Sequence, residues 1–167
     1  IVITSKCIMK CYHNAPEATA EMIDEQGRLH TGDMGYIDDD GCVWITGRVK
    51  EQYKLLNGKY VVPTALEEKI NNSAIIGTAV VFGSGRPHNV VIIRPTDEFI
   101  ADFRAKHGLE NASNAEVENH ADMRGAIEKE IQTMCADFRG YERPQAFAVT
   151  LEEFSIQSGL LTPALKI

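Results

Sequence analysis

The sequence has few cysteines, few aromatic residues and no long apolar run, and each shortage excludes a class of protein. Four cysteines in 167 residues are too few for a disulfide-stabilised scaffold, which favours a reducing, cytoplasmic compartment. The longest apolar run, 74–82, is interrupted by Gly77 and Thr78, whereas a membrane-spanning helix needs about 18 consecutive apolar residues. The sequence therefore predicts no membrane-spanning segment.

Positive charge is also scarce. Lys and Arg number 17 against 24 Asp and Glu, which gives a formal net charge of −7. Proteins that bind nucleic acid normally carry a basic patch or stripe, so nucleic acid is not expected as a partner. The remaining composition, 44% hydrophobic and 25% charged, is that of an ordinary globular chain. At about 150 residues per domain, the length predicts one domain or slightly more.

The two ends of the sequence both resemble cut sites. The chain starts at Ile1 without a methionine, and its first residues lack the charged, apolar and small-residue regions of a signal peptide. It stops at Ile167, directly after Lys166. We therefore expect a fragment whose function depends partly on residues outside it.

Turn signals and apolar periodicity predict the α+β class. Asp-Gly at 40–41 and Asn-Gly at 57–58 each separate two short apolar runs, and such pairs favour β-hairpins because they tolerate positive φ. Tyr36 and Trp44 are expected to pack across the first hairpin. An apolar stripe over 114–138 predicts one continuous buried helical face. Further helices are predicted at 16–23, 63–72 and 96–106, and strands at 34–37, 42–46, 52–56, 60–62, 74–82, 90–93 and 146–151.

Three polar loop segments stand out, at 29–35, 47–54 and 158–166, because binding and catalytic residues concentrate in loops. In the first, Asp33 follows Gly32. A carboxylate beside a glycine can approach a ligand closely and accept two hydroxyl hydrogen bonds, as a ribose diol offers. The alternative is a turn aspartate that bonds its own backbone.

The other two segments offer positive charge. Arg48 presents a planar fork of donors for phosphate or ribose oxygens, or else belongs to a solvated basic turn paired with Glu51. Lys166 closes a loop shaped by glycine and proline and could neutralise developing negative charge, or else is a surface lysine. Taken singly, each segment fits the structural alternative better, and only their combination favours a functional site.

In their order along the chain, these segments resemble the C-terminal third of acyl-CoA synthetases, members of the adenylate-forming, AMP-binding superfamily. The resemblance begins at 9–19, which is similar to the family's MKGYxNNPEAT stretch, and continues through 30–33 and 47–51. The runs 54–63 and 161–166 are most similar to the long-chain fatty-acyl branch. Nearly the whole chain is covered, although Cys11 stands where the family usually has glycine and Arg28 where it often has tryptophan.

The resemblance implies a ligase that joins a carboxylate to ATP, giving acyl-adenylate and pyrophosphate, and then transfers the acyl group to coenzyme A. Asp33 matches the aspartate that holds the ribose hydroxyls of the nucleotide, and Arg48 matches an arginine that contacts the same nucleotide. Lys166 matches the catalytic lysine that bridges the substrate carboxylate and the α-phosphate during adenylation, where it would offset developing charge.

The resemblance also implies a domain organisation. Residues 1–47 would be the end of the large N-terminal adenylation domain, with a β-hairpin remnant, and 48–50 would be the hinge, with Lys50 as the hinge residue. Residues 51–167 would be a small mobile lid domain with short, mostly antiparallel sheets flanked by helices. The Asn57-Gly58 turn, with Lys54 near it, would face coenzyme A after the lid has swung.

The substrates implied are a fatty acid, ATP and coenzyme A, with Mg²⁺ bound by residues upstream of Ile1. The phosphate loop and the acyl pocket would also lie upstream, in the missing N-terminal domain of the same chain, so the fragment by itself is expected to be inactive. The full-length protein could associate peripherally with a membrane. Two alternatives stay open, namely a non-catalytic lid or docking module and an aryl or short-chain acid–CoA ligase of the same superfamily.

No metal ligands are expected within the chain. Cys7 and Cys11 are four residues apart, but no second Cys or His pair with zinc-site spacing follows. His88, His107 and His120 have no candidate partners near them in the sequence.

Overall fold

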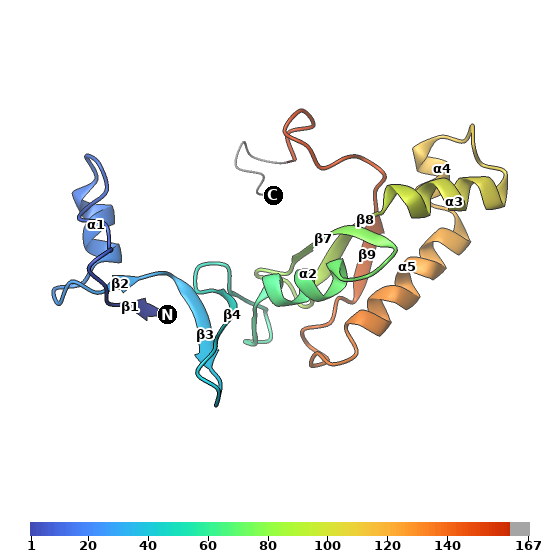
Figure 1. Ribbon diagram of the computed structural model, residues 1–167. Coiled ribbons are helices and arrows are strands. Elements are labelled where there is room, and N and C mark those ends of the chain that lie inside the picture. Colours follow the sequence, from blue (N-terminus) through green and yellow to red (C-terminus); the bar gives the residue numbers. More distant parts are fainter. Residues whose placement is uncertain (161–167) are drawn as a thin grey trace. The chain divides into compact units, whose positions relative to one another are not determined.

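The computed structural model describes residues 1–160. Contacts divide the chain between Gln52 and Tyr53 into two compact units, hereafter the first and the second unit, and each is described by itself (Figure 1). The division lies two residues after the predicted hinge, 48–50. Among the described helices, none is both long and apolar enough to cross a membrane.

The first unit consists of one helix and two small antiparallel sheets. β1 pairs with β2, and β3 pairs with β4 in a hairpin. The helix predicted from Pro16 and the hairpin predicted at Asp-Gly are both confirmed. The rings of Tyr36 and Trp44 stack across the hairpin with centroids 6.5 Å apart, as expected. The elements are β1 (Val2–Ile3), α1 (Pro16–Met22), β2 (Leu29–His30), β3 (Asp33–Ile37) and β4 (Val43–Arg48).

Asp38 fixes the turn between β3 and β4. One carboxylate oxygen accepts from the Cys42 backbone N–H at 2.8 Å, and the other accepts from the Trp44 indole N–H at 2.6 Å. These donors, the indole first, stabilise the charged form and hold the pKa of Asp38 below its usual value. The turn and the aromatic stack therefore support each other.

The second unit is an α+β domain around a three-stranded sheet, so the predicted fold class is confirmed. The sheet order is β7-β8-β9. β7 and β8 are antiparallel, whereas β8 and β9 are parallel, from Val90 opposite Ala146 to Ile93 opposite Val149. The elements are β5 (Tyr53–Lys54), β6 (Tyr60–Val61), α2 (Pro63–Asn71), β7 (Ile76–Phe82), β8 (Val90–Pro95), α3 (Asp97–His107), α4 (Asn114–Glu118), α5 (Ala121–Met134) and β9 (Ala146–Val149).

The parallel β8–β9 pair requires a long connection, and helices supply it. A parallel connection cannot be made by a tight turn and needs a crossover of a dozen or more residues. Here α3, α4 and α5 lie between β8 and β9 in the chain and form that crossover (Figure 1). Their apolar faces join the sheet and α2 in one buried cluster. Its fully buried members include Leu66, Ile70, Ile76, Ile93, Val117, Met123 and Ile127.

The segment 114–138 forms two helices rather than the single helix predicted from its apolar stripe. The helix breaks after Glu118, and a second helix begins at Ala121. Each part has its own N-cap. Ser113 forms a reciprocal capping box with Glu116, and a ring nitrogen of His120 accepts from the Asp122 N–H at 3.2 Å. The apolar stripe continues across the break because Val117 and Met123 both reach the core.

Candidate functional site

The structure brings the two predicted nucleotide-binding residues together. Asp33 begins β3 and Arg48 ends β4, and the two lie directly opposite each other in the antiparallel register. Arg48 Nε lies 3.3 Å from Asp33 Oδ1, and the side chains are 55% and 22% exposed, respectively. A carboxylate and a guanidinium, both accessible to a ligand, therefore stand side by side at one end of the hairpin.

A β-bulge produces this pairing. Met34 lies opposite Gly47 but Gly35 lies opposite Ile45, so Thr46 is the extra residue in β4. Gly47 is buried and has a φ of 149°, within the range that favours glycine. A Cβ at Gly35 would overlap the carbonyl oxygen of Trp44. Bulges commonly redirect a side chain near functional sites, and this one aligns Arg48 with Asp33.

A cavity of about 280 Å³ adjoins Asp33 within the first unit. Sites for complete small molecules usually span about 300–1,000 Å³, so this cavity suits part of a nucleotide rather than all of it. Lys50 is among the lining residues; its Nζ lies 4.0 Å from Glu21 Oε2, and its side chain is 91% exposed. The lining residues are Ile1, Val2, Glu21, Met22, His30, Gly32, Asp33, Val49 and Lys50.

Asp24 is a polar residue of this unit that the sequence analysis missed. Its carboxylate accepts from the Arg28 backbone N–H at 2.9 Å and from Arg28 Nε at 2.7 Å, and it lies 3.0 Å from His30 Nε2. These contacts, the Arg28 backbone bond first, hold the pKa of Asp24 far below its usual value. His30 lines the cavity beside Asp33, so Asp24 fixes the orientation of a ring at the candidate site. In the sequence, the signal for this contact is the spacing of four residues between Asp24 and Arg28.

The residues predicted to face coenzyme A lie together in the β5–β6 hairpin of the second unit. Asn57 Oδ1 accepts from the Lys59 N–H at 3.0 Å, and Gly58 has a φ of 83°, as an Asn-Gly turn requires. The Lys54 ammonium lies 5.6 Å from the centroid of the Tyr60 ring. The Lys54 carbonyl also accepts from the Gly85 N–H at 3.1 Å, which fastens the neighbouring loop to the hairpin.

The remaining predicted site residue, Lys166, lies outside the described residues. Among those that are described, one group could hold a metal ion, formed by His107, His120 and Asp122 in the second unit. The centroids of the two imidazole rings are 4.9 Å apart. The sequence shows no partners near these histidines, but the fold brings His107, at the end of α3, close to His120 and Asp122 at the start of α5.

The sequence is similar to proteins of one enzyme superfamily. Residues 50–143, more than half of the chain, match the family described as AMP-binding enzyme C-terminal domain. Long-chain-fatty-acid–CoA ligase 5 of Rattus norvegicus is 32% identical over 169 residues, which are 99% of this chain and 25% of that protein. The peroxisomal long chain acyl-CoA synthetase 6 of Arabidopsis thaliana is 29% identical over 170 residues, 100% of this chain and 24% of that protein.

The fold is also similar to that of a solved adenylating enzyme. The A domain of carboxylic acid reductase from Segniliparus rugosus, in complex with AMP and a co-purified carboxylic acid, matches with a TM-score of 0.79 at 27% identity. The match covers 99% of this chain and 24% of that chain. The chain thus spans about a quarter of the length of each protein that it resembles.

Proposed function

The chain belongs to the family of AMP-binding enzyme C-terminal domains, and on that premise we propose that it is the C-terminal part of an ATP-dependent long-chain fatty-acid–CoA ligase. The full-length enzyme joins the fatty-acid carboxylate to the α-phosphate of ATP, releasing pyrophosphate. It then passes the acyl group to the thiol of coenzyme A, releasing AMP. The names of the rat and Arabidopsis relatives support this choice of substrates, and Mg²⁺ enters with ATP as part of the substrate.

The observation that carries the proposal is the pairing of Asp33 with Arg48 beside a partial cavity. In our proposal the Asp33 carboxylate accepts hydrogen bonds from both ribose hydroxyls, and Arg48 donates to oxygens of the same nucleotide. The ion pair positions both side chains before the nucleotide arrives. Because exposed ion pairs contribute only about 0–1 kcal/mol, the nucleotide can replace it at little cost.

The other roles concern the two steps of the reaction. We assign Lys166 to adenylation, where its ammonium offsets the charge that develops as the carboxylate attacks the α-phosphate. Lys50 is the hinge about which the second unit reorients between the steps. The Asn57-Gly58 turn and Lys54 then face coenzyme A.

Apolar side chains on the β3–β4 hairpin support the presence of a preceding domain. Ile37 is 70% exposed, Ile45 66% and Val43 59%. Exposed apolar patches of this kind usually mark a contact surface. We propose that the N-terminal domain of the same protein covers them and carries the Mg²⁺ ligands and the acyl pocket. We also propose that the enzyme is cytoplasmic and that, because long acyl chains partition into bilayers, it associates peripherally with membranes.

The direct test is a product assay with the full-length protein. It is incubated with ATP, Mg²⁺, coenzyme A and, in parallel, a long-chain, a short-chain or an aromatic acid, and acyl-CoA and AMP are measured. We expect both products in equal amounts, with the long-chain acid preferred. Preference for the short or aromatic acid would replace the substrate class, and no acid-dependent AMP formation would indicate a non-catalytic module.

A further inference from the structure

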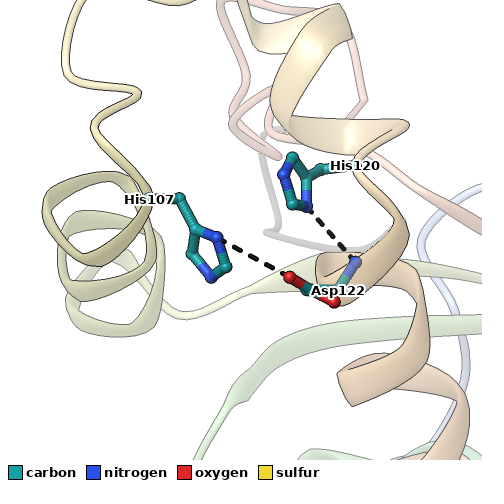
Figure 2. A group of neighbouring side chains, drawn as sticks. All are labelled: His107, His120 and Asp122. Carbon is teal, nitrogen blue, oxygen red and sulfur yellow. Dashed lines mark hydrogen bonds and ion pairs between the residues drawn. The ribbon is translucent and has the colours of Figure 1, made fainter.

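Three metal-ligating side chains in the second unit converge without a role in the proposed ligase reaction. His107 is the last residue of α3, His120 is the N-cap of α5, and Asp122 lies in the first turn of α5. Figure 2 shows the His107 ring turned toward the Asp122 carboxylate, with the His120 ring beside them. From this geometry we propose that His107, His120 and Asp122 bind a divalent transition-metal ion of the zinc type.

The separations are close to those of a bound site. One ligand atom from each residue can be chosen so that all three lie within 4.8 Å of one another, and His107 Nδ1 is 3.7 Å from Asp122 Oδ2. Metal–ligand bonds of about 2.1 Å place the ligand atoms of a tetrahedral zinc site about 3.4 Å apart. Binding therefore requires the ligand atoms to move closer together, and the Asp122 side chain, which is 67% exposed, has room to rotate toward the two rings.

Aromatic packing holds both imidazoles in place. The His107 ring stacks on the buried Phe103 ring, with centroids 4.2 Å apart and planes at 24°. The His120 ring meets Phe103 edge-on at 5.3 Å and His107 at 4.9 Å. Ordering side chains for a ligand costs conformational entropy, and this packing has already met much of that cost for two of the three ligands.

The donor set defines the class of ion. Two imidazole nitrogens and one carboxylate are characteristic of zinc and related first-row divalent metals. The N-terminal end of α5 carries a partial positive charge that opposes a cation, and the Asp122 carboxylate offsets it. Three protein ligands leave a fourth position open for water.

Metal binding competes with the cap of α5. A ring nitrogen of His120 accepts from the Asp122 N–H. A metal on that nitrogen replaces the hydrogen bond, and a metal on the other nitrogen requires the ring proton to move to the capping one. In both cases the Asp122 amide loses its acceptor, so its NMR signal must change on binding.

The test is a Zn²⁺ titration of the 167-residue chain by calorimetry at about pH 7.5, where imidazoles are deprotonated. The exposed Cys7, Cys11 and Cys42 are first replaced by serine, since thiolates also bind zinc. The site variant combines His107→Gln with His120→Asn, which keeps a cap acceptor. The control variant carries His13→Gln and His88→Gln, so that both variants lose two histidines.

We expect the chain with these three serine substitutions and the control to bind one more equivalent of Zn²⁺ than the site variant. His107→Gln alone should weaken binding at least about tenfold, because even changes behind the direct ligands cost 10–100-fold. Equal stoichiometry in all three proteins would overturn the proposal. If the site variant does not fold, ¹⁵N shifts of the chain with the three serine substitutions decide: the His107 and His120 rings and the Asp122 amide must respond before the rings of His13, His30 and His88, and the reverse order refutes the site.

Discussion

At the residue scale, the candidate site depends on a carboxylate whose partner is weakly held. Asp33 contacts Arg48 in an exposed ion pair, and such pairs add little to stability. Replacing Asp33 should therefore leave the fold almost unchanged, while any hydrogen bonds to a bound ribose would be lost. A substitution of Asp33 should therefore change nucleotide binding without changing the stability of the fold.

We predict that Asp33→Asn in the full-length protein lowers kcat/KM for ATP by about 10–100-fold. Hydrogen bonds to a charged group are worth about 1.5–3 kcal/mol, and each 1.36 kcal/mol is tenfold in rate. Asp39→Asn in the exposed β3–β4 turn is the matched control and should be silent. An Asp33→Asn enzyme with normal ATP kinetics would remove Asp33 from the nucleotide site.

The half-buried Tyr53 and the buried Asn89 form a polar contact in the second unit. The Tyr53 hydroxyl donates to Asn89 Oδ1 at 2.7 Å, and Asn89 Nδ2 donates to the Glu142 carbonyl at 2.6 Å. Burial, and then the negative charge of Glu67, raise the pKa of Tyr53 to about 12. The neutral phenol is therefore favoured in the folded chain.

This shift predicts a loss of stability in alkali. An unfolded tyrosine titrates near pH 10, so between about pH 10 and 12 the folded chain binds more protons than the unfolded one. The contribution of the neutral Tyr53 phenol to the free energy of unfolding is complete below about pH 10 and is lost as the pH rises through about 12. Urea unfolding at about pH 9 and about pH 11 should show a steeper decline for the natural chain than for Tyr53→Phe. Equal declines would contradict a role for Tyr53.

At the element scale, α2 protects an open edge of the sheet. β7 is an edge strand, and unpaired edges invite aggregation. Asn71 Oδ1 accepts from the Ala79 N–H and Glu67 Oε1 from the Val81 N–H, both at 2.7 Å. Side chains of the helix thus take the place of a missing neighbouring strand.

Asn71→Ala should therefore destabilise the chain by about 1–3 kcal/mol, the cost of leaving a buried donor such as the Ala79 N–H unpaired. Asn72→Ala, one residue further along, serves as the control because the Asn72 side chain makes no hydrogen bond within residues 1–160. Chemical denaturation of both variants measures the difference. Identical midpoints would mean that water replaces Asn71 without cost.

The proposed hinge leads to a prediction about the two half-reactions. Within the described chain, the Lys50 N–H donates no hydrogen bond, so Lys50→Pro breaks none while fixing φ. If residues 48–50 are the hinge, the variant should fold normally but impair adenylation and thioester formation unequally. Pyrophosphate exchange and single-turnover acyl transfer measure the two steps. An equal loss in both would count against the hinge.

Local signals predicted some elements and missed others, for physical reasons. The two hairpins follow from Asp-Gly and Asn-Gly turns, which act over a few residues. The break at Asn119–His120 has no proline or glycine, and it depends on His120 serving as an N-cap, a role that capping preferences do not assign to histidine. The parallel β8–β9 pair joins strands some fifty residues apart, a distance that no local pattern reports.

At the scale of the whole molecule, the candidate site was predictable only where it follows a family motif. The resemblance predicts nucleotide-binding roles for Asp33 and Arg48. Their direct contact, however, depends on a bulge at Thr46–Gly47, which no sequence pattern predicts. The His107–His120–Asp122 group escaped notice because its members come from two helices. A hairpin can be predicted from its turn, whereas the approach of His107 to His120 and Asp122 depends on how two helices pack.

In our proposal Lys166 supplies the cation that stabilises fatty-acid adenylation in the full-length enzyme, and Lys166→Ala in that protein tests this role most directly. Fatty-acid-dependent pyrophosphate exchange should fall by about 10²–10³-fold, as expected when a strong charge stabiliser is removed. Acyl transfer from pre-formed acyl-adenylate to coenzyme A should stay near normal, because the lysine acts only in the first step. Undiminished pyrophosphate exchange in a folded variant would contradict the account.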